Sequence, residues 1–394
     1  MTVDVMTITI CAALLLAALV TPLCNAMFRK PRGCSATGAA TDDEAEATTG
    51  ATTAGTSLPP LSIVISAHDM GAELERNLPL ILNQVYEPGF EVIVVDESST
   101  DRTADVLTRM KHEHPNLYTT FIPKSSHYLS RRKLALTVGI KAAKNEWIIL
   151  TDADCRPESE KWLACMAAHC HEGNDIVLGY TNYEHAAKRF YRFERMLTSM
   201  YIMRQARKSV AYRYNGNNMA VRKSVFMEHN GFLKNLKYLR GEYDFIVNEY
   251  AQKGRTGVAL QPEAFVRQDC PSRKTWTNTH LFYMETRRHL KRSLPYRLLF
   301  CTDTALLHLN YTADTAVALL SLLLWNNTVT ATAAILSFVI TAAVRMLIAA
   351  KAVKMFGERI SPAVIPLLEL RVMWQNAWFL LRHRISDKYD FIRK

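Results

Sequence analysis

The sequence of 394 residues has no C-x-x-C pair, little glycine or proline, and no charge over two long stretches. Its 8 cysteines are scattered and lie partly in apolar segments, which argues against a disulfide framework or a zinc ribbon and fits a reducing compartment. The content of 15 glycines and 14 prolines excludes collagen, and 49% hydrophobic with 22% charged residues excludes wholesale disorder. The length suits one large domain with extra segments, or two domains.

The first uncharged stretch lies at the N-terminus and predicts a transmembrane anchor over residues 1–28. No charge occurs between Asp4 and Arg29, and such a helix is long enough to cross ~30 Å of hydrocarbon. A basic segment does not precede it, as a cleaved signal would require, whereas Arg29, Lys30 and Arg32 follow it. The positive-inside rule therefore places the C-terminal side of this anchor in the cytosol.

Residues 29–58 are rich in Ala, Thr and Gly, contain an acidic cluster, and show no apolar period. This composition predicts a flexible linker between the anchor and a domain that we expect over residues 59–297.

The C-terminal region, residues 298–394, is predicted to be a second membrane region. Its apolar segments suggest three helices, at about 306–325, 329–350 and 362–381. The first two are expected to form a transmembrane hairpin, in which Asp314 and Arg345 must face the helix bundle or the interface. The third contains Glu369 and Arg371, and a full crossing would leave the basic C-terminal tail on the wrong side. We therefore expect an interfacial or re-entrant helix there.

The middle of the chain alternates short β-branched runs with segments of helical period. Strands are expected at 61–66, 90–95, 118–122 and 146–150, and helices between them. This alternation is typical of an α/β fold with a mostly parallel sheet. In such open sheets ligands bind beyond the carboxyl ends of the strands, so the chemistry is expected there.

Acidic residues follow two of these strands. Asp96 and Glu97 follow the second, and Asp152 and Asp154 follow the fourth, two positions apart on extended backbone. Two such side chains can face one side and share Mg²⁺ or Mn²⁺, which normally completes its shell with water and phosphate oxygens. This favours a nucleotide diphosphate as ligand. The alternative is that both aspartates merely begin a polar turn and cap the next helix.

Six short motifs occur in the order and spacing of one known family. They are IVISAHDM, VVDESSTDRT, RRKLALTVGI, ILTDADCRP, NGNNMAVRKSVF and LRGEYDF. Over residues 58–295 the chain resembles family 2 inverting glycosyltransferases with the nucleotide-binding GT-A fold, and its apolar ends resemble the membrane-anchored bacterial members.

The resemblance implies roles for the strand ends. The nucleoside would be bound by residues at the ends of the first two strands, namely Ser66, Ala67, His68, Asp96 and Glu97. Lys133, with Arg131 and Arg132, would meet the pyrophosphate, unless these three form an exposed cationic face. Asp152 would contact the donor and the metal, and Asp154 is the expected direct metal ligand, with Mg²⁺ or Mn²⁺ as cofactor.

The resemblance also implies a base that takes the proton of the acceptor hydroxyl, from an acidic pair that opens a helix. The corresponding run is Glu242-Tyr243-Asp244, and strict spacing puts Tyr243 where the catalytic aspartate of the family stands. We expect Asp244 to be the base, with Glu242 second. The alternative is that these acids only cap the helix that follows.

Further residues match the acceptor side of the family. Asn217 and Asn218 lie in a turn that corresponds to an acceptor loop, although a plain turn explains them almost as well. Arg288 remains from the motif of processive synthases, whose Gln and Trp are absent here, so transfer of single sugars is expected.

Together these features predict a metal-dependent inverting glycosyltransferase that uses a nucleotide sugar, with UDP as the expected nucleotide. The expected acceptor is a lipid-linked sugar or a glycan. The basic stretches 188–213 and 273–297 lack any RNA-binding motif, so nucleic acid is not an expected partner. The second stretch leads into the membrane hairpin and is expected to attract anionic lipid headgroups or a polyprenyl-phosphate acceptor. The expected location is the bacterial inner membrane with the catalytic domain in the cytosol. The alternatives are a haloacid-dehalogenase-like phosphohydrolase and an inactive protein that binds nucleotide sugars.

Overall fold

The computed structural model of the protein describes residues 4–25, 58–124, 130–291 and 294–386. The chain divides into two compact units. The helical unit comprises residues 1–31, 188–204 and 292–386, and the α/β unit comprises residues 32–187, 205–291 and 387–394. Most of the expected linker, 29–58, falls outside the described residues, and the expected domain boundaries stay predictions.

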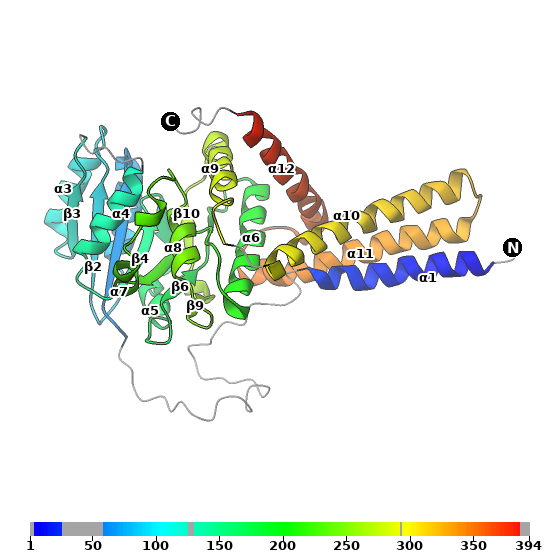
Figure 1. Ribbon diagram of the computed structural model, residues 1–394, viewed down its shortest axis with the longest axis horizontal. Helices are drawn as coiled ribbons and strands as arrows, with labels where there is room; N and C mark the ends of the chain where they lie inside the picture. The colour runs from blue at the N-terminus through cyan, green and yellow to red at the C-terminus, as the bar shows by residue number, and fades with distance from the viewer. Residues whose placement is uncertain (1–3, 26–57, 125–129, 292–293, 387–394) are drawn as a thin grey trace, which may run out of the picture. The chain divides into compact units, whose positions relative to one another are not determined.

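The α/β unit is built on a seven-stranded sheet with the strand order β3-β2-β1-β4-β8-β6-β9 (Figure 1). Its strands are β1 (Leu61–Ala67), β2 (Phe90–Asp96), β3 (Leu117–Phe121), β4 (Trp147–Asp152), β6 (Ile176–Gly179), β8 (Met219–Arg222) and β9 (Thr256–Ala259). The first four strands are parallel, as the sequence predicts. β8 is antiparallel to both β4 and β6, so the sheet as a whole is mixed.

In the described part of the α/β unit, seven helices accompany this sheet. They are α2 (Gly71–Leu82), α3 (Thr103–Glu113), α4 (Arg131–Ala142), α5 (Trp162–Ala167), α7 (Lys223–Glu228), α8 (Glu242–Tyr250) and α9 (Arg273–Thr286). Short 3₁₀ turns occur at η3 (Leu233–Asn235) and η4 (Pro262–Ala264). The expected alternation of strand and helix is therefore present from β1 to β4.

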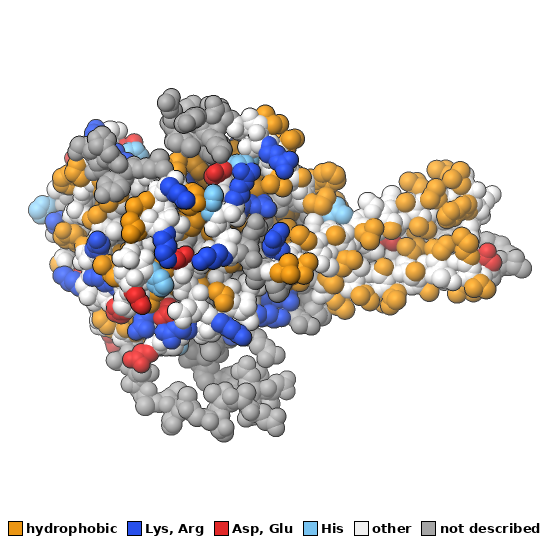
Figure 2. All heavy atoms as spheres, viewed as in Figure 1, with side chains coloured by type: hydrophobic (Ala, Val, Ile, Leu, Met, Phe, Trp, Pro, Cys, Tyr) orange, Lys and Arg blue, Asp and Glu red, His pale blue; other side chains and the backbone are white. Residues whose placement is uncertain are grey.

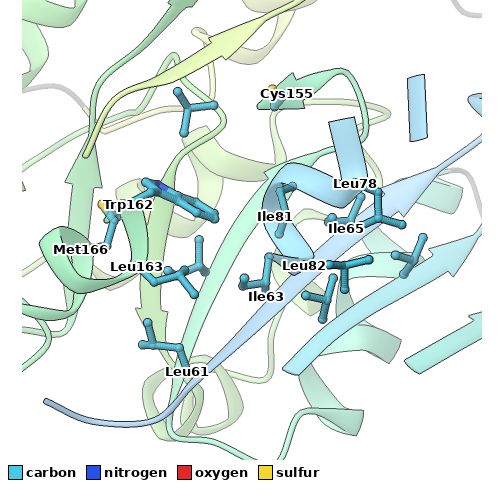
Figure 3. Packing of buried hydrophobic residues seen from close by; sticks show 14 of the residues in the cluster. Leu61, Ile63, Ile65, Leu78, Ile81, Leu82, Cys155, Trp162, Leu163 and Met166 are labelled. Carbon is cyan, nitrogen blue, oxygen red and sulfur yellow. The ribbon is translucent and has the colours of Figure 1, made fainter. Parts of the chain in front are cut away.

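The core lies against β1, because its alternate side chains pack on two helices. Ile63 and Ile65 of β1 contact the cluster formed by the apolar face of α2 and by α5 (Figure 3). Within that cluster Leu78 of α2 and Trp162 of α5 are almost fully buried. Burying each such side chain stabilises the fold by roughly 1.5–3 kcal/mol. This packing holds the strands, and therefore their ends, in fixed positions.

On the other face of the sheet, α4 lies unusually close to β1. A Cβ atom added at Gly139 would come within 2.4 Å of Val64 Cγ1, which real Cβ atoms do not approach. Glycine at this position lets the helix backbone touch the strand. The close packing fixes the N-terminus of α4, where three basic residues follow one another, relative to the ends of β1 and β4.

A second, three-stranded sheet supplements the first, with the order β5-β10-β7. It consists of β5 (Cys155–Pro157), β7 (Thr181–Tyr183) and β10 (Val266–Gln268). β5 directly follows the end of β4, and β10 pairs with it in antiparallel fashion. Through this pairing the small sheet brings Gln268 to the segment that contains Asp154.

The helical unit contains three helices that are long and apolar enough to cross a membrane among the described residues, at Val5–Cys24, Arg297–Leu323 and Thr328–Met355. The elements are α1 (Val5–Val20) with η1 (Thr21–Cys24), α10 (Leu294–Leu323) and α11 (Thr328–Met355). Hydrophobic side chains are numerous on the face of this bundle that Figure 2 shows, and charged ones are few. The unit also includes most of α6 (Arg189–Lys208), the turn η5 (Pro362–Val364) and α12 (Ile365–Ile385).

Polar side chains inside the bundle join its helices. Asn310 of α10 donates to Thr341 of α11 at 2.7 Å, and Ser337 of α11 donates to the carbonyl of Leu14 in α1 at 3.0 Å. Hydrogen bonds of this kind hold apolar helices together where burial against lipid supplies no driving force. Asp314 and Arg345 are buried in the unit, so the expectation that they face the bundle is confirmed.

Candidate active site

The carboxyl ends of three parallel strands meet at one edge of the sheet. Ala67 at the end of β1 pairs with Asp96 at the end of β2, and Ser66 pairs with Asp152 at the end of β4. The register thus places Asp96 and Asp152 on either side of β1. The predicted convergence of acidic strand ends is present, and we call this edge the acidic corner.

The loops after β1 and β2 are tied to one another. Asp69 accepts hydrogen bonds from the backbone N–H of Thr100 at 2.7 Å and from its hydroxyl at 3.2 Å. The N–H of Asp69 in turn donates to Ser99 Oγ at 2.9 Å, and Ser99 donates to Asp96 Oδ1 at 2.5 Å. His68 lies at this rim with an exposed side chain. These hydrogen bonds hold the loops after β1 and β2 together at the rim of the acidic corner.

Asp152 is held by two donors from distant segments. Tyr243 donates its hydroxyl proton to Asp152 Oδ1 at 2.8 Å, and the guanidinium of Arg132 forms a salt bridge with the same oxygen. Although burial opposes its charge, Asp152, Tyr243 and Glu242 raise the pKa of Arg132 above its ordinary value. Among the described residues no hydrogen bond reaches Asp152 Oδ2, so this oxygen keeps its lone pairs.

Asp154 lies beside Asp152 and is held more loosely. Gln268 donates to Asp154 Oδ2 at 2.8 Å, and the thiol of Cys155 is 3.5 Å from Oδ1. Burial, with repulsion from Asp152, raises the pKa of Asp154 to about 6. Two carboxylates that repel one another in a partly buried corner favour a shared cation. The described residues contain no group of three or more His, Cys, Asp or Glu that could hold a metal ion by itself, so water and phosphate oxygens would have to complete the shell.

The N-terminus of α4 presents cations to this corner. Ser130 caps the helix by accepting from the N–H of Lys133 at 3.3 Å, and Arg131, Arg132 and Lys133 fill the first turn. Basic residues in a first turn are unfavourable to the helix dipole by about 0.3–1 kcal/mol each. For Arg132 the salt bridge with Asp152 offsets this unfavourable interaction with the dipole, and Arg131 donates to Ser98 Oγ at 2.8 Å. A site that tolerates this arrangement is suited to an anionic ligand.

The sequence predicts that Lys133 faces the acidic corner, but in the structure it does not. Its side chain is fully buried, and its ammonium donates to the carbonyl oxygens of Asn235 at 2.7 Å and of Tyr238. Burial lowers the pKa of Lys133 to about 8. The ammonium fastens the segment that precedes α8, and Arg132 is the better placed cation for a phosphate.

The helix α8 carries the acidic run that the sequence singles out. Gly241 precedes it with a φ of +91°, a conformation that suits glycine, and a Cβ there would lie 2.5 Å from Thr286 Cγ2. Glu242, Tyr243 and Asp244 form the first turn, where the carboxylates favour the helix dipole. All three side chains are buried.

The two acids of α8 have different surroundings. Asp244 Oδ1 accepts from Arg213 Nε and from the N–H of Tyr214, each at 3.2 Å. Burial raises the pKa of Asp244, and the charge of Arg213 opposes that rise. Glu242 makes no hydrogen bond among the described residues: its Oε1 is buried without a partner, and its Oε2 lies 3.9 Å from Arg132 Nε.

Glu97 belongs to the same electrostatic group. Burial raises the pKa of Glu97, while the charges of Arg132 and Arg240 oppose the rise and Glu242 adds to it. The end of β2 and the first turn of α8 are thus close enough for their carboxylates to interact.

The acceptor-side predictions lie in different places. Asn217 is buried and its amide contacts Cys155 Sγ at 3.4 Å, next to Asp154. Asn218 is fully buried; its amide donates to the carbonyls of Tyr180 and Ala264 and its oxygen accepts from Trp162 Nε1. Asn218 therefore joins three segments of the fold, and its side chain does not reach the corner. Arg288 follows α9 with an exposed side chain that contacts none of the described site residues.

Residues 62–229 match the family described as glycosyl transferase family 2. The chain carries a family 2 glycosyltransferase domain. A mannosyltransferase of Pyrobaculum calidifontis, solved in complex with GDP-Man and Mn²⁺, has the same GT-A fold, with a TM-score of 0.51 at 16% identity over 94% of this chain and 98% of that one. The predicted family and GT-A fold are confirmed for the matched domain.

Two curated relatives align with parts of this glycosyltransferase. A probable glycosyltransferase of Bacillus subtilis, YdaM, is 28% identical over 130 residues, which is 33% of this chain and 28% of the relative. The Escherichia coli protein WfaP, a UDP-Glc:alpha-D-GlcNAc-diphosphoundecaprenol beta-1,3-glucosyltransferase, is 25% identical over 126 residues, or 31% of this chain and 45% of the relative. The chain thus spans less than half of either relative.

Three residues of the glycosyltransferase corner escaped the sequence reasoning. Arg213 and Tyr214 bind Asp244 from 31 and 30 positions away, and Gln268 binds Asp154 from 114 positions away. The basic stretch 188–213, which contains Arg213, was not linked to the acids. No local period or motif marks these residues, since only the fold brings them to the acids.

Proposed function

We propose that this glycosyltransferase transfers a single sugar from a UDP-sugar to a lipid-linked or glycan acceptor at the cytosolic membrane face, with inversion at the anomeric carbon. The observation that carries the proposal is the acidic corner itself, where Asp152 ends β4 and Asp154 follows it within a family 2 domain. The relative WfaP, whose name gives a UDP-Glc donor and a diphosphoundecaprenol acceptor, supports UDP and a lipid-linked acceptor.

A divalent cation fits the residues that are present. Asp152 Oδ2 has free lone pairs, and Asp154 Oδ1 has only a thiol neighbour. Mg²⁺ or Mn²⁺ held there by these two carboxylates would offset the charge that develops on the leaving diphosphate. Carboxylate oxygens with open positions suit either ion. The neighbouring Arg132 would supply a second positive charge to the diphosphate, with Arg131 beside it.

Glu242 is the base that the surroundings favour, in place of the expected Asp244. A general base needs an oxygen that is free to accept a proton, and Glu242 Oε1 is buried and unpartnered among the described residues. Asp244 is committed to Arg213 and Tyr214. In the proposed step the acceptor oxygen attacks the anomeric carbon, the bond to the diphosphate oxygen breaks, and the hydroxyl proton passes to Glu242.

Tyr243 replaces the customary aspartate and takes another role. Its hydroxyl donates to Asp152, which orients that carboxylate so that the second oxygen remains open. Burial and the charge of Asp152 raise the pKa of Tyr243 above its ordinary value, so the phenol stays neutral and cannot serve as a base at pH 7. We regard Tyr243 as a positioning residue.

The location follows from charge. Arg29 and Lys30 follow α1 in the sequence, and Lys351 and Lys354 lie near the C-terminal end of α11, whereas Asp4 marks the other end of α1. The positive-inside rule then puts the cationic end in the cytosol. The phosphohydrolase alternative is not favoured, because residues 62–229 match a glycosyltransferase family.

The test uses the full chain in lipid nanodiscs with Mn²⁺, a panel of UDP-sugars and a membrane lipid extract. We expect UDP release that depends on one sugar, on the metal and on the lipid extract, with a glycosylated lipid as product. The matched control is Glu242→Gln, which should bind donor but not turn over. Absence of UDP release with every donor, or release that Glu242→Gln leaves intact, contradicts the proposal.

A further inference from the structure

The helix α12 (Ile365–Ile385) has two distinct faces. Its buried side chains, which recur every three, four or seven residues, are Ile365, Glu369, Val372, Phe379 and His383. Its outward apolar side chains recur in the same way and are 43% to 75% exposed. They are Leu367, Trp374, Trp378, Leu381 and Ile385. We call this second set the tryptophan stripe. Such spacing places the stripe along one side of the helix.

The inward face of α12 is fastened to the membrane-spanning helices. Glu369 Oε2 accepts from Arg345 Nε of α11 at 2.6 Å, and Glu369 Oε1 accepts from Asn25 Nδ2, just beyond η1, at 2.8 Å. Arg345 also donates to Asp303 of α10 at 3.3 Å. Removing a partner from a buried ion pair is strongly unfavourable, so this network holds α12 in one place on the bundle.

The attachment lies at one end of the bundle. Asn25 follows η1 at the C-terminal end of α1, Asp303 is in the first third of α10, and Arg345 is in the C-terminal half of α11. This end carries the exposed cations Lys351 and Lys354 of α11. The turn that joins α10 to α11 at the opposite end contains no charge. The positive-inside rule puts this cationic end at the cytosolic headgroups, which would hold α12 near that level.

Cations accompany the stripe. Arg371, Arg382 and Arg384 are exposed, and the guanidinium of Arg382 lies 5.0 Å from the ring centre of Trp378. Tryptophan prefers the membrane interface, and arginine beside it attracts anionic headgroups. With Glu369 and three arginines, α12 is not among the helices that are apolar enough to cross. Figure 2 shows apolar and basic side chains together on this helix.

From these observations we propose that the tryptophan stripe of α12 is a docking surface for an anionic lipid bilayer, on which the helix lies without crossing. The buried network around Arg345 sets its depth, because it ties the helix to the spanning segments. A bilayer fits better than a second copy of this chain, since the cations beside the stripe would repel their own counterparts. The proposal is independent of the sugar transfer.

Quenching by brominated lipids tests the depth of the stripe. The full chain is placed in nanodiscs with bromine near the headgroup or near the chain ends, and compared with the Trp374→Phe/Trp378→Phe double variant. The difference between the two proteins reports on the stripe alone. We expect this difference to be quenched more strongly by shallow than by deep bromine. No quenching means that protein covers the stripe, and strongest quenching by deep bromine means that the helix crosses; either result overturns the proposal.

Lipid charge is tested in discs of equal phosphatidylglycerol and phosphatidylcholine, with only one of the two brominated. We expect bromo-phosphatidylglycerol to quench the stripe severalfold more efficiently. The Arg371→Gln/Arg382→Gln/Arg384→Gln variant should lose this preference. Replacing three exposed lysines of the α/β unit, Lys111, Lys161 and Lys253, by Gln should leave it unchanged. Equal quenching by both lipids in the unmodified protein overturns the choice of an anionic surface.

Discussion

Substitutions of the two acids of α8 should have different effects, one on catalysis and the other on stability. Glu242 and Asp244 are two residues apart in the first turn of α8, yet Glu242 Oε1 has no partner among the described residues, whereas Asp244 is bound by Arg213 and Tyr214. If Glu242 is the base, Glu242→Gln should lower kcat by about 10²–10⁴, the usual contribution of a general base. The same change removes no hydrogen bond among the described residues, so the fold should keep its stability.

Asp244→Asn should act mainly on stability. It removes the charge that compensates buried Arg213, and breaking a buried pair on one side costs roughly 3–5 kcal/mol. For a domain of this size each kcal/mol corresponds to about 2–4 °C in Tm, so a fall of about 6–20 °C is expected. At a temperature where the variant remains folded, its kcat should stay within about tenfold of the unmodified enzyme.

Both variants are compared as full chains in the same nanodiscs, by thermal unfolding and by UDP release at saturating donor. Donor affinity of Glu242→Gln, measured by calorimetry, should be unchanged. The assignment is refuted if Glu242→Gln remains active while Asp244→Asn keeps its Tm and loses turnover, because Asp244 would then be the base.

Three further predictions concern the surroundings of the corner. Tyr243→Phe removes a hydrogen bond of about 1 kcal/mol to Asp152, so Mn²⁺ affinity should fall about fivefold while kcat at saturating metal changes little; Mn²⁺ binding by spin resonance checks this. Lys133→Met leaves two carbonyls without their donor, so Tm should fall by several degrees with donor affinity unchanged; a large loss of affinity at unchanged Tm would return Lys133 to the pyrophosphate. Since the pKa of Glu97 in the folded protein lies above its usual value of 4.5, the stability linked to its protonated form is present below that pH and is lost as pH rises through the raised pKa. Glu97→Gln should flatten Tm over that pH range, and an unaltered pH profile would contradict the shift.

The parallel half of the sheet was predictable because its signals are local. β1, β2 and β4 are runs of β-branched residues, and the spacing of Leu74 and Leu78 indicates the buried face of α2. The antiparallel strand β8 and the sheet β5-β10-β7 were not predicted. These strands have only three or four residues, and the strands that pair with them lie far away in the sequence. No periodicity in the sequence therefore indicates them.

The candidate site was also predictable only in part. Residues that follow strands, such as Asp96, Asp152 and Asp154, were placed correctly at one edge because parallel strands bring their ends together. Lys133 and Asn218 were misplaced because a motif gives a backbone position and not the direction of a side chain. The preference for Glu242 over Asp244 depends on Arg213, whose position only the folded chain reveals.

The central claim is that Asp152 and Asp154 hold a cation that binds the diphosphate of the donor. Its most direct test is a titration of the full chain with Mn²⁺, with and without UDP, monitored by electron paramagnetic resonance. The unmodified protein is compared with Asp154→Ala. We predict one bound Mn²⁺ per chain that requires UDP, lost in Asp154→Ala while Tm is retained. Equal Mn²⁺ binding by both proteins, or no UDP-dependent binding in the unmodified one, would contradict the account.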